Sequence, residues 1–381
     1  MKKRFQRLLC VMLGMALITG SIAGCGDSAD TSDTTKSNES ASEAVSDSVG
    51  VTTTSADDDI LYDIPGYDES ESEENMGEVN ASNEDAVGME ALPDDYIPDD
   101  MTNSATEQGT LVELDYEREL TTISGDPLYS TAVVYLPYGY TEDKKYDVLY
   151  LMHGMGGSQY TFLGNESLAG GMKVVLDSMI QNGDIKPVIV VAPGLEESAD
   201  VDLANIVIGE LIDSIVNHLM PLVESTYSTY ANSTSEEDLI ASRDHRCFGG
   251  FSMGGCATWQ MLRYYPEYFK YFIPNSMIAD FRLDADVDGT TEKLAEGIRE
   301  KGYSSDDFLV YCGVGTEDYT NFMVEKQIAA CLEYDDLFTD TGDFGFEKGN
   351  LMYRVWPDRV HRFYESFPYF YNALKLFFPA E

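Results

Sequence analysis

Positive charge is scarce in this sequence. Its 381 residues include 24 Lys and Arg against 68 Asp and Glu, which gives a formal net charge of −44 at pH 7. Nucleic acids and anionic lipid headgroups repel so acidic a chain. The composition therefore excludes a nucleic-acid-binding protein and favours a neutral or cationic partner.

Cysteine is also sparse, with six in the chain. Cys10 and Cys25 fall in an N-terminal targeting region, which leaves four for the rest of the chain: Cys247, Cys256, Cys312 and Cys331. Their spacing matches neither a zinc motif nor a dense disulfide framework. The apolar runs around Cys247 and Cys312 predict buried free thiols. A single disulfide bond between two of the four cysteines is the alternative.

The first 25 residues have the pattern of an export signal. A basic start, with Lys2, Lys3 and Arg4, precedes an apolar run that ends in small residues. The end of this run, Ile-Ala-Gly-Cys25, resembles the bacterial lipobox, which implies a lipid on the Cys25 sulfur and cleavage just before it. We therefore expect an exported protein that Cys25 anchors to the cell membrane, facing outside. A plain secretory signal is the alternative.

Residues 26–109 are rich in Ser, Thr, Asp, Glu and Asn and hold one basic residue, Lys36. They offer too little apolar surface to offset the entropy lost on ordering, so we expect a disordered, self-repelling acidic tether. The folded domain is predicted to span residues 110–381, with no repeat and no second domain.

Strand and helix patterns alternate through this predicted domain. The strand candidates are residues 111–117, 131–136, 146–152, 187–192, 246–251, 271–274, 308–314 and 351–356, and the helix candidates include 172–181, 206–223, 256–265, 292–299 and 367–377. Residues 148–151 and 188–191 are apolar without alternation, which is typical of strands buried on both faces of a parallel sheet. The alternation predicts one α/β layer sandwich with a mostly parallel sheet of about eight strands and an antiparallel edge.

One glycine-rich stretch lies between a predicted strand and a predicted helix. It reads CFGGFSMGGCA, and Gly250-Phe251-Ser252-Met253-Gly254 fits the G-x-S-x-G pattern of a nucleophile elbow. Gly250 and Gly254 allow the backbone to pass close to itself in a sharp turn that exposes Ser252 Oγ. Because the N–H of Met253 and the helix N-terminus point at the same place, Ser252 is the candidate nucleophile and Met253 a candidate oxyanion donor. A tightly packed turn without catalysis is the alternative.

A second glycine-rich turn follows the predicted strand 146–152. Its sequence, His153-Gly-Met-Gly-Gly, resembles the turn that supplies the other oxyanion donor in lipases and esterases. Gly154 and Gly156 allow the backbone to approach a substrate oxygen, and the N–H of Met155 is the expected donor. His153 is predicted to be structural, with a hydrogen bond inside the loop.

A serine nucleophile needs a base, and the chain has only four histidines. His153 is in the wrong chain order, and His218 lies within a helical pattern. His245 precedes the elbow strand and should lie at its far end. His361 follows the last predicted strand and can reach the carboxyl edge of the sheet beside Ser252, so we predict it as the base.

The acid that orients this base is expected after a strand between Ser252 and His361. Residues 308–314 form such a predicted strand, and Asp318 and Glu317 follow it. Asp318 is the first candidate and Glu317 the second. An exposed turn aspartate that caps the following helix is the alternative reading of Asp318.

Together these motifs resemble the esterase D and feruloyl esterase branch of the α/β-hydrolases, carbohydrate esterase family one. The resemblance rests on YLPYGYTEDKKYDVLYLMHGMGG, RCFGGFSMGG, VYCGVGTED and a late histidine, and it covers residues 110–378. It implies a three-layer α/β-hydrolase sandwich that needs no cofactor. The family positions that carry over are the triad Ser252, Asp318 and His361 and the oxyanion donors Met155 and Met253.

The sequence departs from this branch around the histidine. Family members usually carry Gly-Gly-His-Asp or Gly-His-x-Trp there, whereas this chain has Asp358-Arg359-Val360-His361-Arg362. We therefore expect an unusual substrate pocket beside His361.

The resemblance implies a serine esterase that hydrolyses carboxylic esters through an acyl-enzyme. Acyl or feruloyl groups on a polysaccharide or oligosaccharide are the expected substrates. An acyltransferase of mycolyltransferase type and a non-catalytic carbohydrate-binding relative are the alternatives on the same fold.

An acidic stretch, DADVDG, matches the first half of a calcium loop. Its twelfth position would be Ala295 instead of glutamate, so the bidentate ligand is missing. We therefore expect a solvated acidic loop, and no metal site, at Asp284, Asp286 and Asp288.

Overall fold

The computed structural model describes residues 89–91, 95–121, 125–195, 201–342 and 345–380. The predicted signal peptide with Cys25, and residues 26–88 of the predicted tether, lie outside the described residues.

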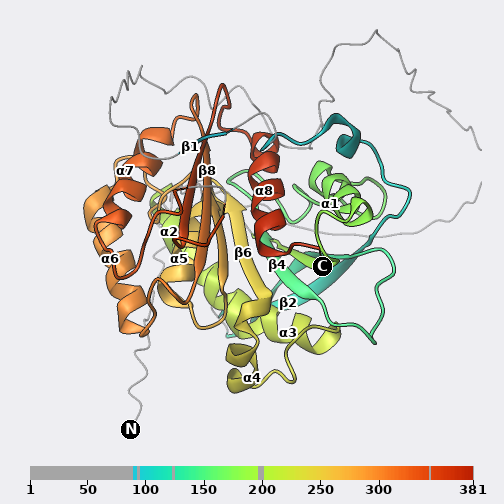
Figure 1. Ribbon diagram of the computed structural model, residues 1–381. Coiled ribbons are helices and arrows are strands. Elements are labelled where there is room, and N and C mark those ends of the chain that lie inside the picture. Colours follow the sequence, from blue (N-terminus) through green and yellow to red (C-terminus); the bar gives the residue numbers. More distant parts are fainter. Residues whose placement is uncertain (1–88, 92–94, 122–124, 196–200, 343–344, 381) are drawn as a thin grey trace, which may run out of the picture. The chain divides into compact units, whose positions relative to one another are not determined.

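Nine strands form one mostly parallel sheet at the centre of the described part of the chain (Figure 1). They are β1 (Met89–Glu90), β2 (Thr110–Thr121), β3 (Pro127–Leu136), β4 (Asp147–Met152), β5 (Val188–Pro193), β6 (Arg246–Phe251), β7 (Tyr271–Asn275), β8 (Leu309–Gly315) and β9 (Leu351–Trp356). Their order across the sheet is β1-β9-β8-β7-β6-β4-β5-β3-β2. β3 pairs antiparallel with β2 and β5, and the other pairs are parallel, so the predicted antiparallel edge is present.

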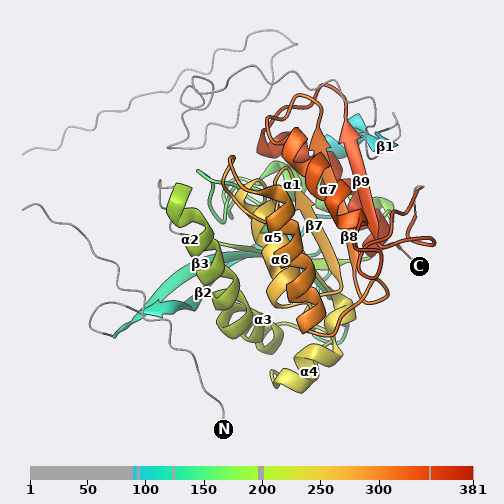
Figure 2. The same ribbon diagram turned by 90° about the vertical axis from the view of Figure 1, so that its left-hand side faces the viewer.

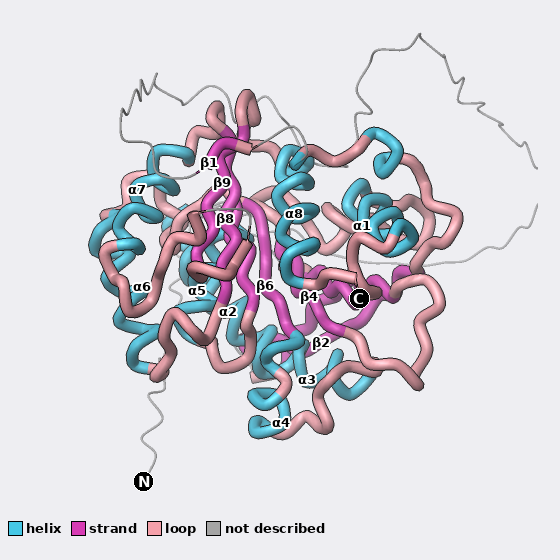
Figure 3. The backbone as a smooth tube through the Cα atoms, in the orientation of Figure 1, coloured by secondary structure: helices cyan, strands magenta, loops and turns pink. Residues whose placement is uncertain are grey.

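Helices cover both faces of the sheet (Figures 2 and 3). One face carries α1 (Gly171–Asn182) and α8 (Phe367–Phe377), and the other carries α2 (Val201–Ser214), α5 (Met253–Tyr264), α6 (Val287–Glu300) and α7 (Asn321–Leu332). The shorter elements are α3 (Met220–Thr226), α4 (Glu236–Ala241), a π-helical turn (Ile215–Leu219) and 3-10 turns at Asp99–Thr102, Arg243–His245 and Phe363–Ser366. The predicted three-layer sandwich is therefore confirmed, with nine strands where about eight were expected.

The central strands are buried on both faces. All six residues of β4 are buried. Leu149 and Leu151 lie in the core beneath α1 and α8, whereas Val148 and Tyr150 lie in the core on the opposite face. Because side chains alternate between the faces of a strand, an unbroken apolar run is what such a position requires.

A long helical segment, Ala204–Thr226, joins α2, the π-helical turn and α3. By length and composition alone it could cross a membrane, with a mean hydropathy of 1.5 in its most apolar window. Its apolar residues Ile208, Leu211 and Leu219 are buried against the sheet. It therefore belongs to the core of this domain.

The domain begins before residue 110, which corrects the predicted boundary of the tether. Residues 89–91 and 95–109, here called the N-terminal strap, lie against the domain. β1 pairs with β9, the N–H of Thr106 donates to Gln181 Oε1 over 2.9 Å, and Met101 is buried. The composition of residues 26–109 did not predict this packing, because the segment is polar on average and is held by a few isolated apolar side chains and backbone hydrogen bonds.

Candidate active site

Ser252 occupies a strained turn between β6 and α5. Its φ of 56° and ψ of −116° are unusual for a residue with a side chain. Its N–H donates to Asn275 O over 3.0 Å, and its carbonyl accepts the N–H of Cys256 over 2.9 Å. These bonds hold the turn in a conformation that the residue would not adopt by itself.

The glycines around Ser252 are required by close backbone contacts. A Cβ on Gly250 would lie 2.5 Å from the Gly254 backbone, and one on Gly254 would lie 2.2 Å from Met152 O. A Cβ on Gly255 would lie 2.3 Å from Asn275 O. The crowding that the sequence predicted is therefore present, and it packs the start of α5 against the ends of β4 and β7.

His361 lies between Ser252 and Asp318 and contacts both. Its Nε2 is 2.8 Å from Ser252 Oγ, and its Nδ1 is 2.8 Å and 3.0 Å from the two oxygens of Asp318. A carboxylate only accepts, so Nδ1 carries the proton and Nε2 is free to accept from the serine hydroxyl. The structure thus brings together the three side chains predicted from chain order.

The surroundings of Asp318 keep it ionised. Burial raises the pKa of the carboxyl, but attraction to His361 and hydrogen bonds from His361 and Thr320 outweigh burial and hold the pKa below its usual value. Thr320 donates twice to Oδ1, from its N–H over 2.8 Å and from its hydroxyl over 2.7 Å. Glu317, the second candidate, is exposed, and the structure does not bring it to His361.

Two aromatic rings flank the imidazole of His361. The ring centroid of Phe251 lies 4.6 Å away and that of Tyr319 lies 4.2 Å away. Sequence reasoning missed the contacts of Tyr319 and Thr320. The Asp-x-Thr spacing, which is typical of a side chain that bonds the backbone two residues on, was the available signal for Thr320.

The two predicted oxyanion donors lie next to Ser252 in the chain or in space. Met253 is the first residue of α5, so its N–H has no acceptor within the helix. The turn that carries Met155 passes directly beside the serine, because a Cβ on Gly154 would lie 3.2 Å from Ser252 Cβ. Gly156 has a φ of 80°, which explains the glycine at that position.

His153 fixes the orientation of the peptide that contains the Met155 N–H. Its Nδ1 lies 2.7 Å from Gly154 O, and Gly157 N–H donates to the same oxygen over 3.1 Å. Gly154 O and Met155 N–H belong to one planar peptide and point in opposite directions. Burial lowers the pKa of His153 to about 4, so the ring is neutral at pH 7. The predicted structural role of His153 agrees with these contacts.

The other two histidines lie away from Ser252. His218 contacts Glu119 over 3.3 Å, and His245 contacts Asp147 over 2.9 Å at the amino end of β6. Ser252 follows the carboxyl end of β6, so a strand of six residues, about 20 Å long, separates it from His245.

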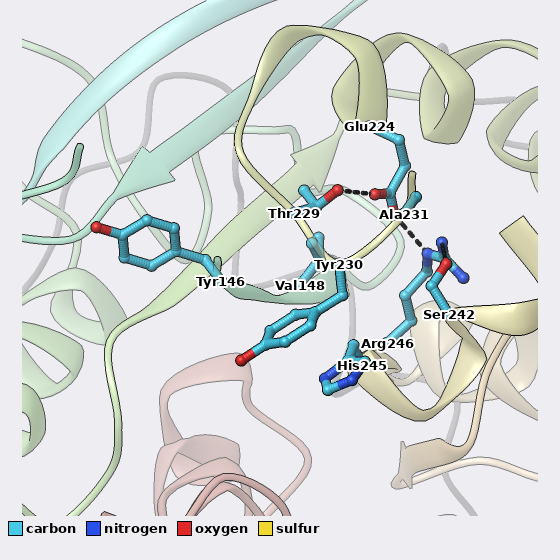
Figure 4. A pocket seen from close by; sticks show the side chains of 9 residues that line it. All are labelled: Tyr146, Val148, Glu224, Thr229, Tyr230, Ala231, Ser242, His245 and Arg246. Atoms are coloured by element: carbon cyan, nitrogen blue, oxygen red, sulfur yellow. Dashed lines mark hydrogen bonds and ion pairs between the residues drawn. The ribbon is translucent and has the colours of Figure 1, made fainter. Parts of the chain in front are cut away.

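A small pocket at this amino end of β6 is not a catalytic site (Figure 4). Arg246 lines it and pairs with Glu224 over 2.5 Å, and both side chains are buried. Arg246 also donates to Leu239 O and to Ser242 Oγ, each over 2.6 Å. The polar groups are thus satisfied by the protein itself, and the ion pair joins α3, α4 and β6.

The structure describes four cysteines, Cys247, Cys256, Cys312 and Cys331, and all four are buried and free. This agrees with the prediction for Cys247 and Cys312.

In the acidic stretch, Asp286 caps the N-terminus of α6, and Asp288 pairs with Lys326 over 3.0 Å. Within the described residues, no three His, Cys, Asp or Glu side chains are grouped as metal ligands.

Comparison with known proteins identifies the family. The family model Esterase, described as "Putative esterase", matches residues 129–334. The chain belongs to this esterase family. It is a hydrolase of carboxylic esters, and the predicted α/β-hydrolase fold is confirmed. The match ends before His361, and the hydrogen bonds of this residue to Ser252 and Asp318 connect it to the site.

Three relatives of this esterase carry informative names. The feruloyl esterase module from Clostridium thermocellum, solved as a serine-to-alanine mutant complexed with sinapinate, is 32% identical, with a TM-score of 0.62 over 78% of this chain and 96% of that one. Endo-1,4-beta-xylanase Y of Acetivibrio thermocellus is 35% identical over 247 residues, which are 64% of this chain and 21% of the relative. Endo-1,4-beta-xylanase/feruloyl esterase of Xylanibacter ruminicola is 31% identical over 37% of this chain and 19% of the relative. The chain thus spans about a fifth of the length of these two curated relatives.

Proposed function

We propose that this esterase cleaves esters between a phenolic acid of the feruloyl class and a sugar hydroxyl of a polysaccharide or oligosaccharide, with Ser252, His361 and Asp318 as a catalytic triad. The observation that carries the mechanism is the hydrogen-bond chain from Ser252 Oγ through His361 to Asp318, with 2.8 Å at each step. The substrate class is supported by the relatives named as a feruloyl esterase and as xylanases.

In the first half of the reaction the enzyme becomes acylated. Ser252 Oγ attacks the ester carbonyl carbon while His361 Nε2 takes the hydroxyl proton. The carbonyl π electrons move to oxygen and form a tetrahedral oxyanion. When the oxyanion collapses, the bond to the sugar oxygen breaks, and the His361 imidazolium gives its proton to that oxygen. The products are the free sugar hydroxyl and an acyl-Ser252 ester.

In the second half water replaces the sugar. His361 Nε2 accepts a proton from water, whose oxygen attacks the acyl carbon of acyl-Ser252. Collapse of the second oxyanion returns the proton to Ser252 Oγ and releases the carboxylic acid. The buried Asp318 carboxylate stabilises the imidazolium in both halves and holds Nδ1–H in place.

The N–H groups of Met253 and Met155 stabilise both oxyanions in this mechanism. Such donors are most effective when they are fixed before the reaction, because no reorganisation is then needed as charge develops. The start of α5 fixes Met253, and the two hydrogen bonds to Gly154 O fix the Met155 peptide. The positive end of the α5 dipole adds to the same effect.

The proposal extends to the location of the enzyme. An exported lipoprotein held at Cys25, with the acidic residues 26–88 as a spacer, would carry the esterase to extracellular plant polysaccharide. Metabolic labelling with a radioactive fatty acid tests this part: the wild-type chain incorporates label, and Cys25→Ala does not. Equal labelling of both proteins would contradict the anchor.

Ser252→Ala tests the nucleophile, with Ser276→Ala as the matched control. Ser276 also has a φ of 56°, is buried and follows a strand of the same sheet. We expect Ser252→Ala to lose ester hydrolysis and labelling by a fluorophosphonate, and Ser276→Ala to keep both. Hydrolysis by Ser252→Ala at the wild-type rate would refute the mechanism.

A panel of acyl esters tests the substrate class. Methyl ferulate, methyl sinapate, aryl acetates and feruloylated arabinoxylan fragments are compared by kcat/KM, with a sugar alcohol added as a possible acyl acceptor. We expect the hydroxycinnamoyl esters to give the highest values and water to be the main acceptor. A preference for acetyl esters, or transfer to the sugar, would refute the substrate class or the hydrolytic reaction respectively.

A further inference from the structure

The base lies on an irregular loop, residues 357–362, that follows β9; we call it the histidine loop. Asp358 in this loop has a φ of 59°. Thr316 holds one side of the loop and lies in the same turn as Asp318. The Thr316 N–H donates to Trp356 O over 2.9 Å, and Thr316 Oγ1 accepts the Asp358 N–H over 2.9 Å. The position of His361 therefore depends on what supports the other parts of the loop.

Tyr96 of the N-terminal strap supplies a second support. Its ring meets the indole of Trp356, the last residue of β9, edge to face with centroids 5.2 Å apart. The guanidinium of Arg359, which lies within the histidine loop, is 5.2 Å from the centre of the same ring. Arg359 also forms an ion pair with Glu365 in the 3-10 turn, Phe363–Ser366, that follows the loop. The ring of Tyr96 thus contacts both Trp356, directly before the loop, and Arg359, in the middle of the loop.

The strap itself is held firmly enough to act as a support. β1 pairs with β9, and the Ala91 N–H continues the pairing with a 2.8 Å hydrogen bond to Val355 O. Asn372 of α8 donates from Nδ2 to Asp95 O over 2.6 Å, directly before Tyr96. The strap therefore ties β9 to α8 at the point where the histidine loop begins.

We propose that Tyr96 is a positioning residue for His361 and acts through Trp356 and Arg359. This inference rests on the proposed function, since it takes His361 as the base. His361 must keep two hydrogen bonds, to Ser252 and to Asp318, in one ring orientation. Without the Tyr96 ring, Arg359 loses the surface on which it lies and the loop gains freedom on that side.

The expected consequence is a slower chemical step with little change in substrate binding. A displacement of about 1 Å at a catalytic group costs up to about a hundredfold in rate, so a partly loosened loop should cost about tenfold in kcat. KM should stay within about twofold, because Tyr96 acts through Trp356 and Arg359 on the position of His361 and not through a contact with the substrate.

The test compares full-length Tyr96→Ala, Tyr96→Leu and Tyr96→Phe, with Tyr129→Ala as the matched control. Tyr129 lies on β3 with 60% of its surface exposed. We measure kcat and KM with an aryl ester below the melting temperature of every variant, and the exchange of the deshielded Nδ1 proton of His361 by NMR. Tyr96→Ala should lower kcat about tenfold and speed proton exchange, while Tyr96→Phe and Tyr129→Ala should match the wild type.

Tyr96→Leu decides the question if Tyr96→Ala does not fold, because it keeps apolar bulk but offers no aromatic face to Arg359. Wild-type kcat in folded Tyr96→Leu, or an equal loss in Tyr96→Phe and Tyr96→Ala, would overturn the proposal. His361→Ala separates this result from a failure of the mechanism. Activity in His361→Ala refutes the triad, whereas an inactive His361→Ala beside fully active Tyr96 variants refutes only the role of Tyr96.

Discussion

Gly254→Ala is the substitution for which the structure gives the sharpest expectation. A Cβ at this position would lie 2.2 Å from Met152 O and 2.8 Å from the carbonyl carbon of the same residue. Ordinary contact begins at 3.4 Å, so the two backbones must move apart by more than 1 Å. No rotamer change can relieve this clash, because both contacting atoms belong to the main chain of β4.

The required movement affects both stability and catalysis. Overpacking in a close-packed interior costs roughly 1–3 kcal/mol, and a clash with main chain belongs at the upper end, so we expect a loss of about 3 kcal/mol. Met152 directly precedes the turn that carries Met155. A shift of about 1 Å there would misplace the proposed oxyanion donor, which costs up to about a hundredfold in kcat.

The assay is urea unfolding at pH 7 together with kcat for an aryl ester, and Gly209→Ala is the matched control. Gly209 lies in α2, and a Cβ there would meet no atom within 4 Å. The control should gain about 0.5–1 kcal/mol from better helix propensity and keep its activity. If Gly254→Ala unfolds within 1 kcal/mol of the wild type and retains full kcat, the crowding explanation of the elbow glycines is wrong.

Three further predictions concern other buried polar groups. Lowering the pH from 7 to 4 should lower the free energy of unfolding by up to about 3 kcal/mol through His153, because its pKa in the folded state, about 4, lies below the ordinary 6.5 and the unfolded chain takes up the proton first. Urea unfolding at each pH measures this loss, and an equal loss in His153→Gln would contradict the prediction. Asp318→Asn should lower kcat by about 10⁴-fold and leave KM nearly unchanged, with exposed Glu317→Gln as the control; a loss below tenfold would remove Asp318 from the mechanism. Arg246→Met should cost about 3–5 kcal/mol because it leaves the Glu224 carboxylate buried without its partner, and urea unfolding of Arg246→Met beside the wild type measures it; a smaller cost would mean that the ion pair is dispensable.

Local patterns predicted the centre of the fold and of the site. The strands 246–251 and 351–356 were predicted with the bounds that the structure has for β6 and β9, because the elbow turn at Ser252 ends the first run and Pro357 ends the second. Ser252 was found from its glycine neighbours, and His361 from chain order. Each of these inferences depends on residues that are adjacent in sequence or on the known direction of parallel strands.

Contacts between distant segments could not be predicted in the same way. No local pattern indicates that Tyr96 meets Trp356 or that Tyr319 lies against His361. α7 was missed because polar residues interrupt its apolar positions, and its packing against β8 and α6 comes from the tertiary structure. Tertiary context decides such elements, since propensity alone is a weak guide.

Backbone strain in the described part collects where the triad is assembled. Its three non-glycine residues with positive φ are Ser252, Ser276 and Asp358, which follow β6, β7 and β9. Each one leads to a member of the proposed triad. Ser252 is the proposed nucleophile, and Asp358 turns the loop that carries His361. The Ser276 carbonyl lies 3.1 Å from Oγ1 of Thr320, whose N–H donates to Asp318. Strain of this kind persists only where the surroundings over-determine it. The carboxyl ends of three strands of one sheet, β6, β7 and β9, therefore maintain geometry that no single loop could hold.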